Sequence, residues 1–153
     1  MRWSRESPPA SRLPRPRIAG SRDAAAGLID DPYRVRVKCL IVDDNSPFLE
    51  GATDLLRREG LDVVGVASDS AEAIRLVTEL RPDVTLVDVD LGDEDGFELA
   101  RQLNEISSSK VILVSTHAEE DLEHLIAASP ALGFVAKSRL SAQSIRDLLE
   151  RAA

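Results

Sequence analysis

The sequence has a single cysteine, few aromatic residues and no long apolar run. One cysteine in 153 residues excludes an intramolecular disulfide and a zinc site built from several cysteines. The apolar runs reach only about six residues, whereas a membrane-spanning helix requires roughly 20. Arg2 and Arg5 are not followed by the apolar stretch of roughly seven residues that a secretory signal peptide needs. These absences favour a protein without a membrane span that resides in the reducing cytoplasm.

The formal net charge of −8 is distributed unevenly along the chain. Residues 1–36 carry eight arginines against four acidic residues, whereas residues 37–153 carry 11 lysines and arginines against 23 acidic residues. An acidic surface repels the phosphates of nucleic acids. Direct DNA binding by the folded domain is therefore not expected.

Two regions of different character follow one another in the sequence. Residues 1–35 contain Pro, Ser, Arg and Gly without an apolar period, which predicts a disordered basic tail. Residues 36–153 have the length of one domain. In this part, apolar runs alternate with amphipathic segments. Ser46 followed by proline predicts an N-cap and the first helical position, and Asp69 with Glu72 has the spacing of a capping box. A further helix is predicted around residues 121–128. The predicted strands, each followed by a helix, are 37–42, 61–67, 84–87, 111–114 and 134–136. Five such units predict an α/β fold, a doubly wound parallel sheet with helices on both faces.

Polar residues stand where the predicted strands end. They are Asp43 and Asp44 after the first strand, Asp88 after the third, Ser115 and Thr116 after the fourth, and Lys137 after the fifth. The carboxyl ends of parallel strands meet at one edge of the sheet, where such folds place their sites. Two carboxylates ~5 Å apart repel each other by about 3 kcal/mol at an effective dielectric constant near 20. A cation is needed to relieve this repulsion, and oxygen ligands without His or Cys favour Mg²⁺.

Four segments of the sequence resemble the receiver domain of two-component response regulators. They are Ile41-Val-Asp-Asp-Asn45, Pro82-Asp-Val-Thr-Leu-Val-Asp88-Val-Asp-Leu-Gly-Asp-Glu-Asp-Gly96, Val114-Ser115 and Phe134-Val-Ala-Lys137. The resemblance covers residues 37–153 and includes the spacing between the motifs. It implies a flavodoxin-like sheet of strand order 2-1-3-4-5.

The resemblance also implies a chemical role for each acidic residue of the site. Asp88 is the phosphoacceptor, which takes a phosphoryl group from a sensor histidine kinase or a phosphotransfer protein. Asp44 would ligate Mg²⁺ directly, Asp43 through water and Asp90 through its main-chain carbonyl, and Asp88 belongs to the same metal site. Mg²⁺ would neutralise charge on the transferring phosphoryl group.

The same resemblance assigns four further residues to phosphoryl binding and switching. Ser115 and Lys137 would contact the phosphoryl oxygens, and the movement of Ser115 would let Phe134 turn inward and change a surface for an unidentified downstream protein. Asp90 and His117 occupy positions that tune the lifetime of the acyl phosphate. The alternatives, a static core aromatic at Phe134 and a solvated loop residue at His117, stay open.

The sequence departs from the family pattern at two positions. Gly92 and Ser138 stand where the family usually has proline, so looser loops around the site are expected. Only sixteen residues follow Lys137, which leads us to expect output through a separate protein. No turnover of a separate substrate is expected beyond self-phosphorylation and slow self-dephosphorylation.

Two other functions account for part of the sequence. Asp88-Val-Asp90 could belong to a haloacid-dehalogenase-type phosphatase, but that motif requires Thr or Val at Gly92 and leaves Asp43 and Asp44 without a role. A receiver-like binding module that does not use phosphorylation would normally lack an acidic residue or the lysine, and this chain retains all of them. No glycine-rich phosphate loop or Ser-His-Asp set is recognisable in the sequence.

Overall fold

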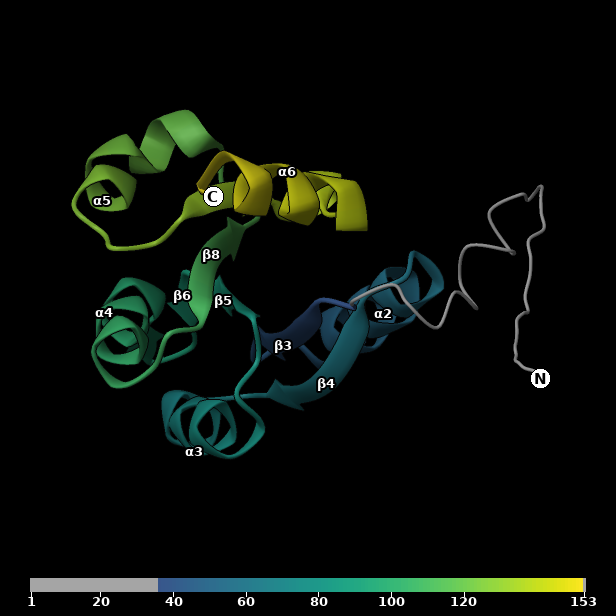
Figure 1. The fold of residues 1–153 in the computed structure, drawn as a ribbon. Coiled ribbons are helices and arrows are strands. Elements are labelled where there is room, and N and C mark those ends of the chain that lie inside the picture. The colour runs from purple at the N-terminus through teal and green to yellow at the C-terminus, as the bar shows by residue number, and fades with distance from the viewer. Residues whose placement is uncertain (1–35, 153) are drawn as a thin grey trace, which may run out of the picture. The chain divides into compact units, whose positions relative to one another are not determined.

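The predicted strands are present in residues 36–152, the part of the chain that the computed structural model describes (Figure 1). The predicted disordered tail, residues 1–35, lies outside the described residues. The strands are β3 (Lys38–Val42), β4 (Asp62–Ala67), β5 (Val84–Asp88), β8 (Lys110–Ser115) and β9 (Gly133–Ala136). They pair in parallel in the order β4-β3-β5-β8-β9, which confirms the predicted order 2-1-3-4-5 and the flavodoxin-like topology. A small antiparallel hairpin of β6 (Asp90–Leu91) and β7 (Glu94–Asp95) follows β5.

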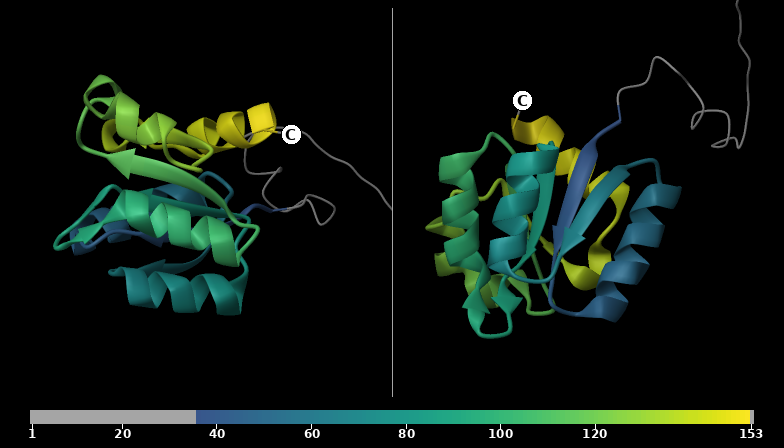
Figure 2. Two further views of the ribbon diagram at one scale, coloured as in Figure 1. Left: turned by 90° about the vertical axis from the view of Figure 1, so that its left-hand side faces the viewer. Right: turned by 90° about the horizontal axis from the view of Figure 1, so that it is seen from below.

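Helices cover both faces of the sheet (Figure 2). The α-helices are α2 (Ser46–Arg58), α3 (Ser70–Leu80), α4 (Gly96–Ile106), α5 (Glu123–Ala127) and α6 (Ala142–Ala152). Buried side chains of α2 and α6 pack on one face, and those of α3 and α4 pack on the other. Within residues 36–152, no helix has the length and apolarity required to cross a membrane.

The alternation of side chains along the central strands divides the core into two layers. Cys39 and Ile41 of β3 point into the layer beneath α2 and α6, whereas Leu40 and Val42 point into the opposite layer, and all four are completely buried. This period-2 pattern on a strand covered on both sides explains why β3 is a continuous apolar run.

Two helix N-termini show how well the capping signals predicted local structure. The sequence favoured Ser46 as the N-cap of α2, but this was wrong, because Asn45 is the cap and its side chain accepts a hydrogen bond from Phe48 N–H at 3.0 Å. The side chain of Asn45 thus satisfies an amide that has no partner within the helix. The N-cap of α3 is Asp69, which accepts from Glu72 N–H at 2.8 Å, in agreement with the sequence pattern.

The fourth helical segment is less regular than the sequence indicated. One helix was expected near 121–128, but a 3-10 turn, η2 (Glu119–Leu122), precedes the five-residue α5. Neither element contains a buried residue, so tertiary packing stabilises this segment weakly. A second 3-10 turn, η3 (Lys137–Arg139), follows β9.

Candidate functional site

The polar residues of the strand ends meet in one pocket at the carboxyl edge of the sheet. Asp43 directly follows β3, Asp88 and Ser115 are the last residues of β5 and β8, and Lys137 directly follows β9. The pocket has a volume of about 270 Å³. Its lining consists of Asp43, Asp44, Asn45, Asp88, Asp90, Gly92, Ser115, Thr116 and Lys137. Six of the eight site residues predicted from the sequence therefore lie together.

Lys137 is the cation that connects the acidic residues in this structure. Its Nζ lies 2.6 Å from Asp43 Oδ2 and 3.3 Å from Asp88 Oδ2. Only 13% of the lysine side chain is exposed, so water screens these ion pairs weakly. Asp43 Oδ2 is buried and, within residues 36–152, has its ion pair with Lys137 but no well-formed hydrogen bond.

Three carboxylates provide the ligand set of a candidate metal centre. One oxygen from each of Asp43, Asp44 and Asp88 lies within 4.8 Å of the others. Asp43 is completely buried and Asp88 is 5% exposed, whereas Asp44 is exposed to solvent. Lys137 is the single cationic side chain in the lining of this pocket, so the carboxylates leave it with excess negative charge. This excess and the Asp43 oxygen without a well-formed hydrogen bond fit a hard divalent cation such as Mg²⁺.

Burial and neighbouring charges shift the proton affinity of the two central groups. Burial raises the pKa of Asp88 from its usual 3.8 to about 6, and the charge on Asp43 adds to this, while the Asp90 N–H and Lys137 oppose it. Burial lowers the pKa of Lys137, but the contact with Asp43 and the charges of both aspartates outweigh it and raise the pKa overall. Asp88 is therefore a carboxylate whose charge is costly in the absence of a further cation.

The hairpin β6–β7 forms one wall of the pocket beside Asp88. Asp90 N–H donates a hydrogen bond to Asp88 Oδ1 at 3.2 Å. Gly92 has a φ of +68°, in the left-handed region that favours glycine, and a Cβ there would lie 3.1 Å from Asp44 Oδ2. The hairpin backbone thus approaches two of the three carboxylates.

Gly96 begins α4 directly beneath the end of β5. A Cβ at Gly96 would lie 2.0 Å from the carbonyl oxygen of Asp88, a distance that no side chain can adopt. The Gly96 N–H donates to Val89 O at 3.0 Å. The absence of a side chain at Gly96 therefore permits the backbone of α4 to pack closely against the end of β5.

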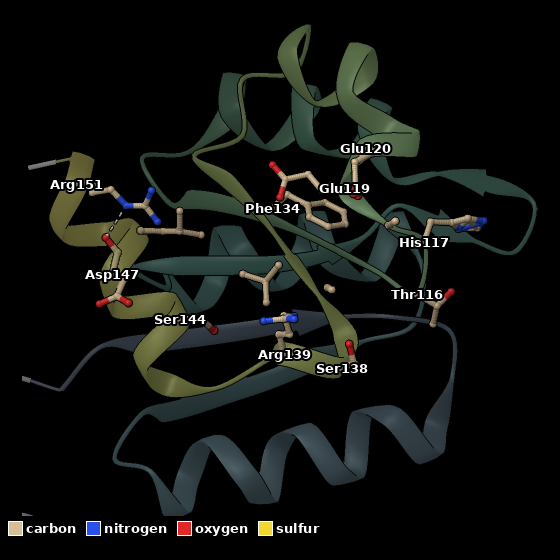
Figure 3. Close-up of a pocket in the computed structure, with 14 residues that line it drawn as sticks. Thr116, His117, Glu119, Glu120, Phe134, Ser138, Arg139, Ser144, Asp147 and Arg151 are labelled. Atoms are coloured by element: carbon tan, nitrogen blue, oxygen red, sulfur yellow. Dashed lines mark hydrogen bonds between the residues drawn. The ribbon is translucent and has the colours of Figure 1, made fainter.

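Ser115, His117 and Phe134 connect the acidic pocket to a neighbouring one. Ser115 is 1% exposed, and its Oγ accepts a hydrogen bond from His117 N–H at 2.9 Å. His117 Nδ1 lies 3.5 Å from the same hydroxyl oxygen. The neighbouring pocket has a volume of about 590 Å³, and Figure 3 shows that His117 and the half-buried Phe134 line it. The structure therefore places these two predicted site residues beside the acidic pocket rather than within it.

One contact of the site was missed in the sequence. The ring of Phe48, on α2, lies 4.4 Å from Lys137 Nζ, which is within cation–π distance. An apolar residue on the buried stripe of an amphipathic helix carries no signal of such a contact. Only the juxtaposition of α2 with the end of β9 reveals it.

Comparison with known proteins shows which family has this arrangement. A family model described as the response regulator receiver domain matches residues 39–150. Transcriptional regulatory protein LiaR of Bacillus subtilis is 30% identical over 109 residues, which cover 70% of this chain and 52% of that protein. Protein-glutamate methylesterase/protein-glutamine glutaminase 2 of Koribacter versatilis is 30% identical over 118 residues, which cover 72% of this chain and 32% of that protein. The chain thus spans about half or less of the length of these curated relatives.

Solved structures show the same fold. The signal receiver domain of the response regulator NarL from Mycobacterium tuberculosis superposes with a TM-score of 0.68 at 28% identity, covering 78% of this chain and 98% of that one. The chemotaxis response regulator CheY4 of Vibrio cholerae superposes with a TM-score of 0.65 at 23% identity, covering 78% of this chain and 100% of that one. This second similarity is evidence for the fold alone. The strand order, the acidic pocket and the matching family model lead to one conclusion: the chain belongs to the response regulator receiver domain family of two-component systems.

Proposed function

We propose that the chain is a phosphorylation switch in which Asp88 accepts a phosphoryl group in a Mg²⁺-dependent reaction. The observation that carries this proposal is the cluster of Asp43, Asp44 and Asp88 with Lys137 between two of them. An oxygen of Asp88 attacks phosphorus, the bond from phosphorus to the imidazole nitrogen of the donor histidine breaks, and the imidazole keeps that electron pair. The donor is a sensor histidine kinase or a phosphotransfer protein.

The acidic residues bind the metal and position the nucleophile. Asp44 and Asp88 would hold Mg²⁺ directly, Asp43 would hold it through water, and the main-chain carbonyl of Asp90 would complete the protein ligands. Mg²⁺ in this place would supply positive charge that offsets the negative charge of the transferring phosphoryl group. The hydrogen bond from Asp90 N–H orients Asp88 Oδ1 and leaves Oδ2 on the side of Lys137.

Ser115 and Lys137 convert phosphorylation into a change of structure. Lys137 exchanges part of its contact with the aspartates for a contact with one phosphoryl oxygen. The Ser115 hydroxyl gives up its local contact with His117 and donates a hydrogen bond to a second phosphoryl oxygen. The movement of Ser115 frees space that Phe134 enters from the neighbouring pocket. Asp90 and His117, two residues beyond Asp88 and Ser115, tune the lifetime of the acyl phosphate by controlling the access of water.

The output of this switch passes to a separate downstream protein that contacts the surface around Phe134. We place the reaction in the cytoplasm, in keeping with the single, buried cysteine Cys39. The reaction is limited to phosphorylation and slow dephosphorylation of the chain itself. The folded domain contributes no DNA-binding surface, because its charge is strongly negative.

Phosphorylation by a small donor tests the proposal directly. Incubation with acetyl phosphate and Mg²⁺ should add one phosphoryl group to the parent, as measured by intact-mass spectrometry. Asp88→Asn should remain unlabelled, and EDTA should suppress the labelling of the parent. Equal labelling of the parent and Asp88→Asn would disprove the assignment of the phosphoacceptor.

A further inference from the structure

The hairpin β6–β7 carries backbone that lies close to the acidic pocket. Asp90 and Gly92 line this pocket, and Gly92 lies against the Asp44 carboxylate. A small displacement of the hairpin would therefore change the distances among Asp90, Asp44 and Asp88. The sequence alone predicted a loose loop here, because Gly92 replaces the proline that is usual in the family.

A carboxylate clamp joins this hairpin to helix α3. Glu94 Oε1 accepts a hydrogen bond from Ser70 N–H at 2.8 Å, and Glu94 Oε2 accepts one from the Ser70 hydroxyl at 2.7 Å. Ser70 is the first residue of α3, where amide groups lack partners within the helix and negative charge is favourable. Within residues 36–152, these are the two side-chain hydrogen bonds between the hairpin and α3.

The clamp complements the other attachments of the hairpin. Leu91 is 4% exposed and belongs to the core layer beneath α3 and α4. Asp95 Oδ1 accepts a hydrogen bond from Phe97 N–H at 2.9 Å and so caps α4. The turn at Gly92 and Asp93 is exposed to solvent, so Glu94 supplies the restraint from the side of α3.

We infer that Glu94 is a positioning residue for the metal centre, which acts through Ser70 to hold the hairpin backbone against Asp44 and Asp88. This inference rests on the proposed function. A hairpin that is ordered before the metal binds avoids the entropic cost of ordering it at binding, so the clamp raises the affinity for Mg²⁺. The restraint comes from another helix rather than from a proline within the loop.

Mg²⁺ titration of three variants of the full chain tests this role. Groups that hydrogen-bond directly to metal ligands typically contribute about tenfold or more to metal affinity, and Glu94 acts one step further away, through the hairpin backbone. We therefore expect the dissociation constant, measured by calorimetry, to rise roughly three- to tenfold in Glu94→Ala and by a smaller factor in Ser70→Ala, which changes no charge. The control Asp93→Asn removes one negative charge from the turn of the same hairpin and should raise the dissociation constant for Mg²⁺ at most about twofold.

Two further measurements separate positioning from a general structural role. Amide hydrogen exchange in EDTA should be faster at residues 90–95 in Glu94→Ala, while the thermal midpoint stays near that of the parent. At saturating Mg²⁺, Glu94→Ala should be labelled by acetyl phosphate as fast as the parent. Only the Mg²⁺ concentration that gives half of the maximal rate should differ between the two proteins. Glu94→Gln should regain part of the affinity, since its side-chain oxygen still accepts from Ser70 N–H.

The outcomes distinguish failure of this inference from failure of the proposed function. An unchanged Mg²⁺ affinity in Glu94→Ala, or a loss no larger than that of Asp93→Asn, overturns the inference alone. Absence of Mg²⁺ binding in the parent overturns the proposed function and the inference with it.

Discussion

Asp88 combines burial with negative charge, and this makes the stability of the metal-free protein depend on pH. Its pKa is about 6 in the folded protein and near 3.8 when unfolded, so the folded state binds more protons between these values. The free energy of unfolding therefore receives the full contribution of this group below pH 3.8 and loses it as pH rises through 6. The loss reaches roughly 2 to 3 kcal/mol at pH 7, since one pKa unit corresponds to about 1.4 kcal/mol.

Asp88→Asn tests this relationship. In EDTA, the variant should be more stable than the parent at pH 7, with a difference that shrinks as pH falls to 4. Urea denaturation of both proteins across this range gives the measurement, and pH effects common to both cancel in the difference. Asp44→Asn should also stabilise the metal-free protein, by less, because Asp44 is exposed. A constant difference between Asp88→Asn and the parent at all pH values would contradict the prediction.

Lys137 balances the charge of two buried aspartates. We expect Lys137→Met to lower the free energy of unfolding in EDTA by about 3 kcal/mol, because removal of one partner leaves Asp43 buried with no compensating cation. Mg²⁺ should bind the variant more tightly than the parent, since the lysine no longer competes for the carboxylates. Lys110→Met, at an exposed position, is the control. Equal stability of the two variants in EDTA would show that the ion pairs contribute little.

At the level of elements, the packing of α4 against the end of β5 depends on the missing side chain of Gly96. Gly96→Ala would place a Cβ 2.0 Å from the Asp88 carbonyl oxygen, so α4 or β5 must move. We expect a loss of about 2 to 4 kcal/mol in the free energy of unfolding, measured in urea. Gly51→Ala is a matched control on α2, where nothing lies within 4 Å of the added Cβ. This control should gain roughly 0.5 to 1 kcal/mol, and similar losses in both variants would be inconsistent with the steric argument.

At the scale of the whole molecule, the prediction concerns whether the domain needs the N-terminal segment, residues 1–35. Deletion of residues 1–34 should leave folding, Mg²⁺ binding and Asp88 phosphorylation intact, because the segment has no apolar period and its opposite charge permits only salt-screened contact. Trp3 is the only tryptophan, so its emission should resemble that of a solvent-exposed indole and change little on unfolding. A blue-shifted emission in the native protein, or a truncated chain that melts several degrees lower, would show that the segment is part of the fold.

The strand and helix units and the location of the site followed from the sequence, because local periodicity defines the units and parallel strands share one carboxyl edge. The strand order followed instead from the resemblance to the receiver domain family. The apolar run of β3 and the amphipathic helix after it are readable without knowledge of distant residues, and parallel strands bring their carboxyl ends together. Asp43, Asp88, Ser115 and Lys137 could therefore be placed at one edge in advance. The helix at 121–128 was less well predicted, because a segment with no buried residue obeys packing preferences only weakly.

The number and type of the repeating units can be predicted from the amino-acid sequence alone, as can the charged strand ends and the family to which the motifs point. The contacts between residues distant in the chain become visible only in the folded structure. Glu94 bonds to Ser70 across 24 positions of the chain, and the ring of Phe48 contacts Lys137, which lies in a distant part of the sequence. The raised pKa of Asp88 likewise results from burial, which depends on every element packed around β5. The physical reason is that periodicity is a property of neighbouring residues, whereas distances between elements and desolvation are properties of the assembled fold.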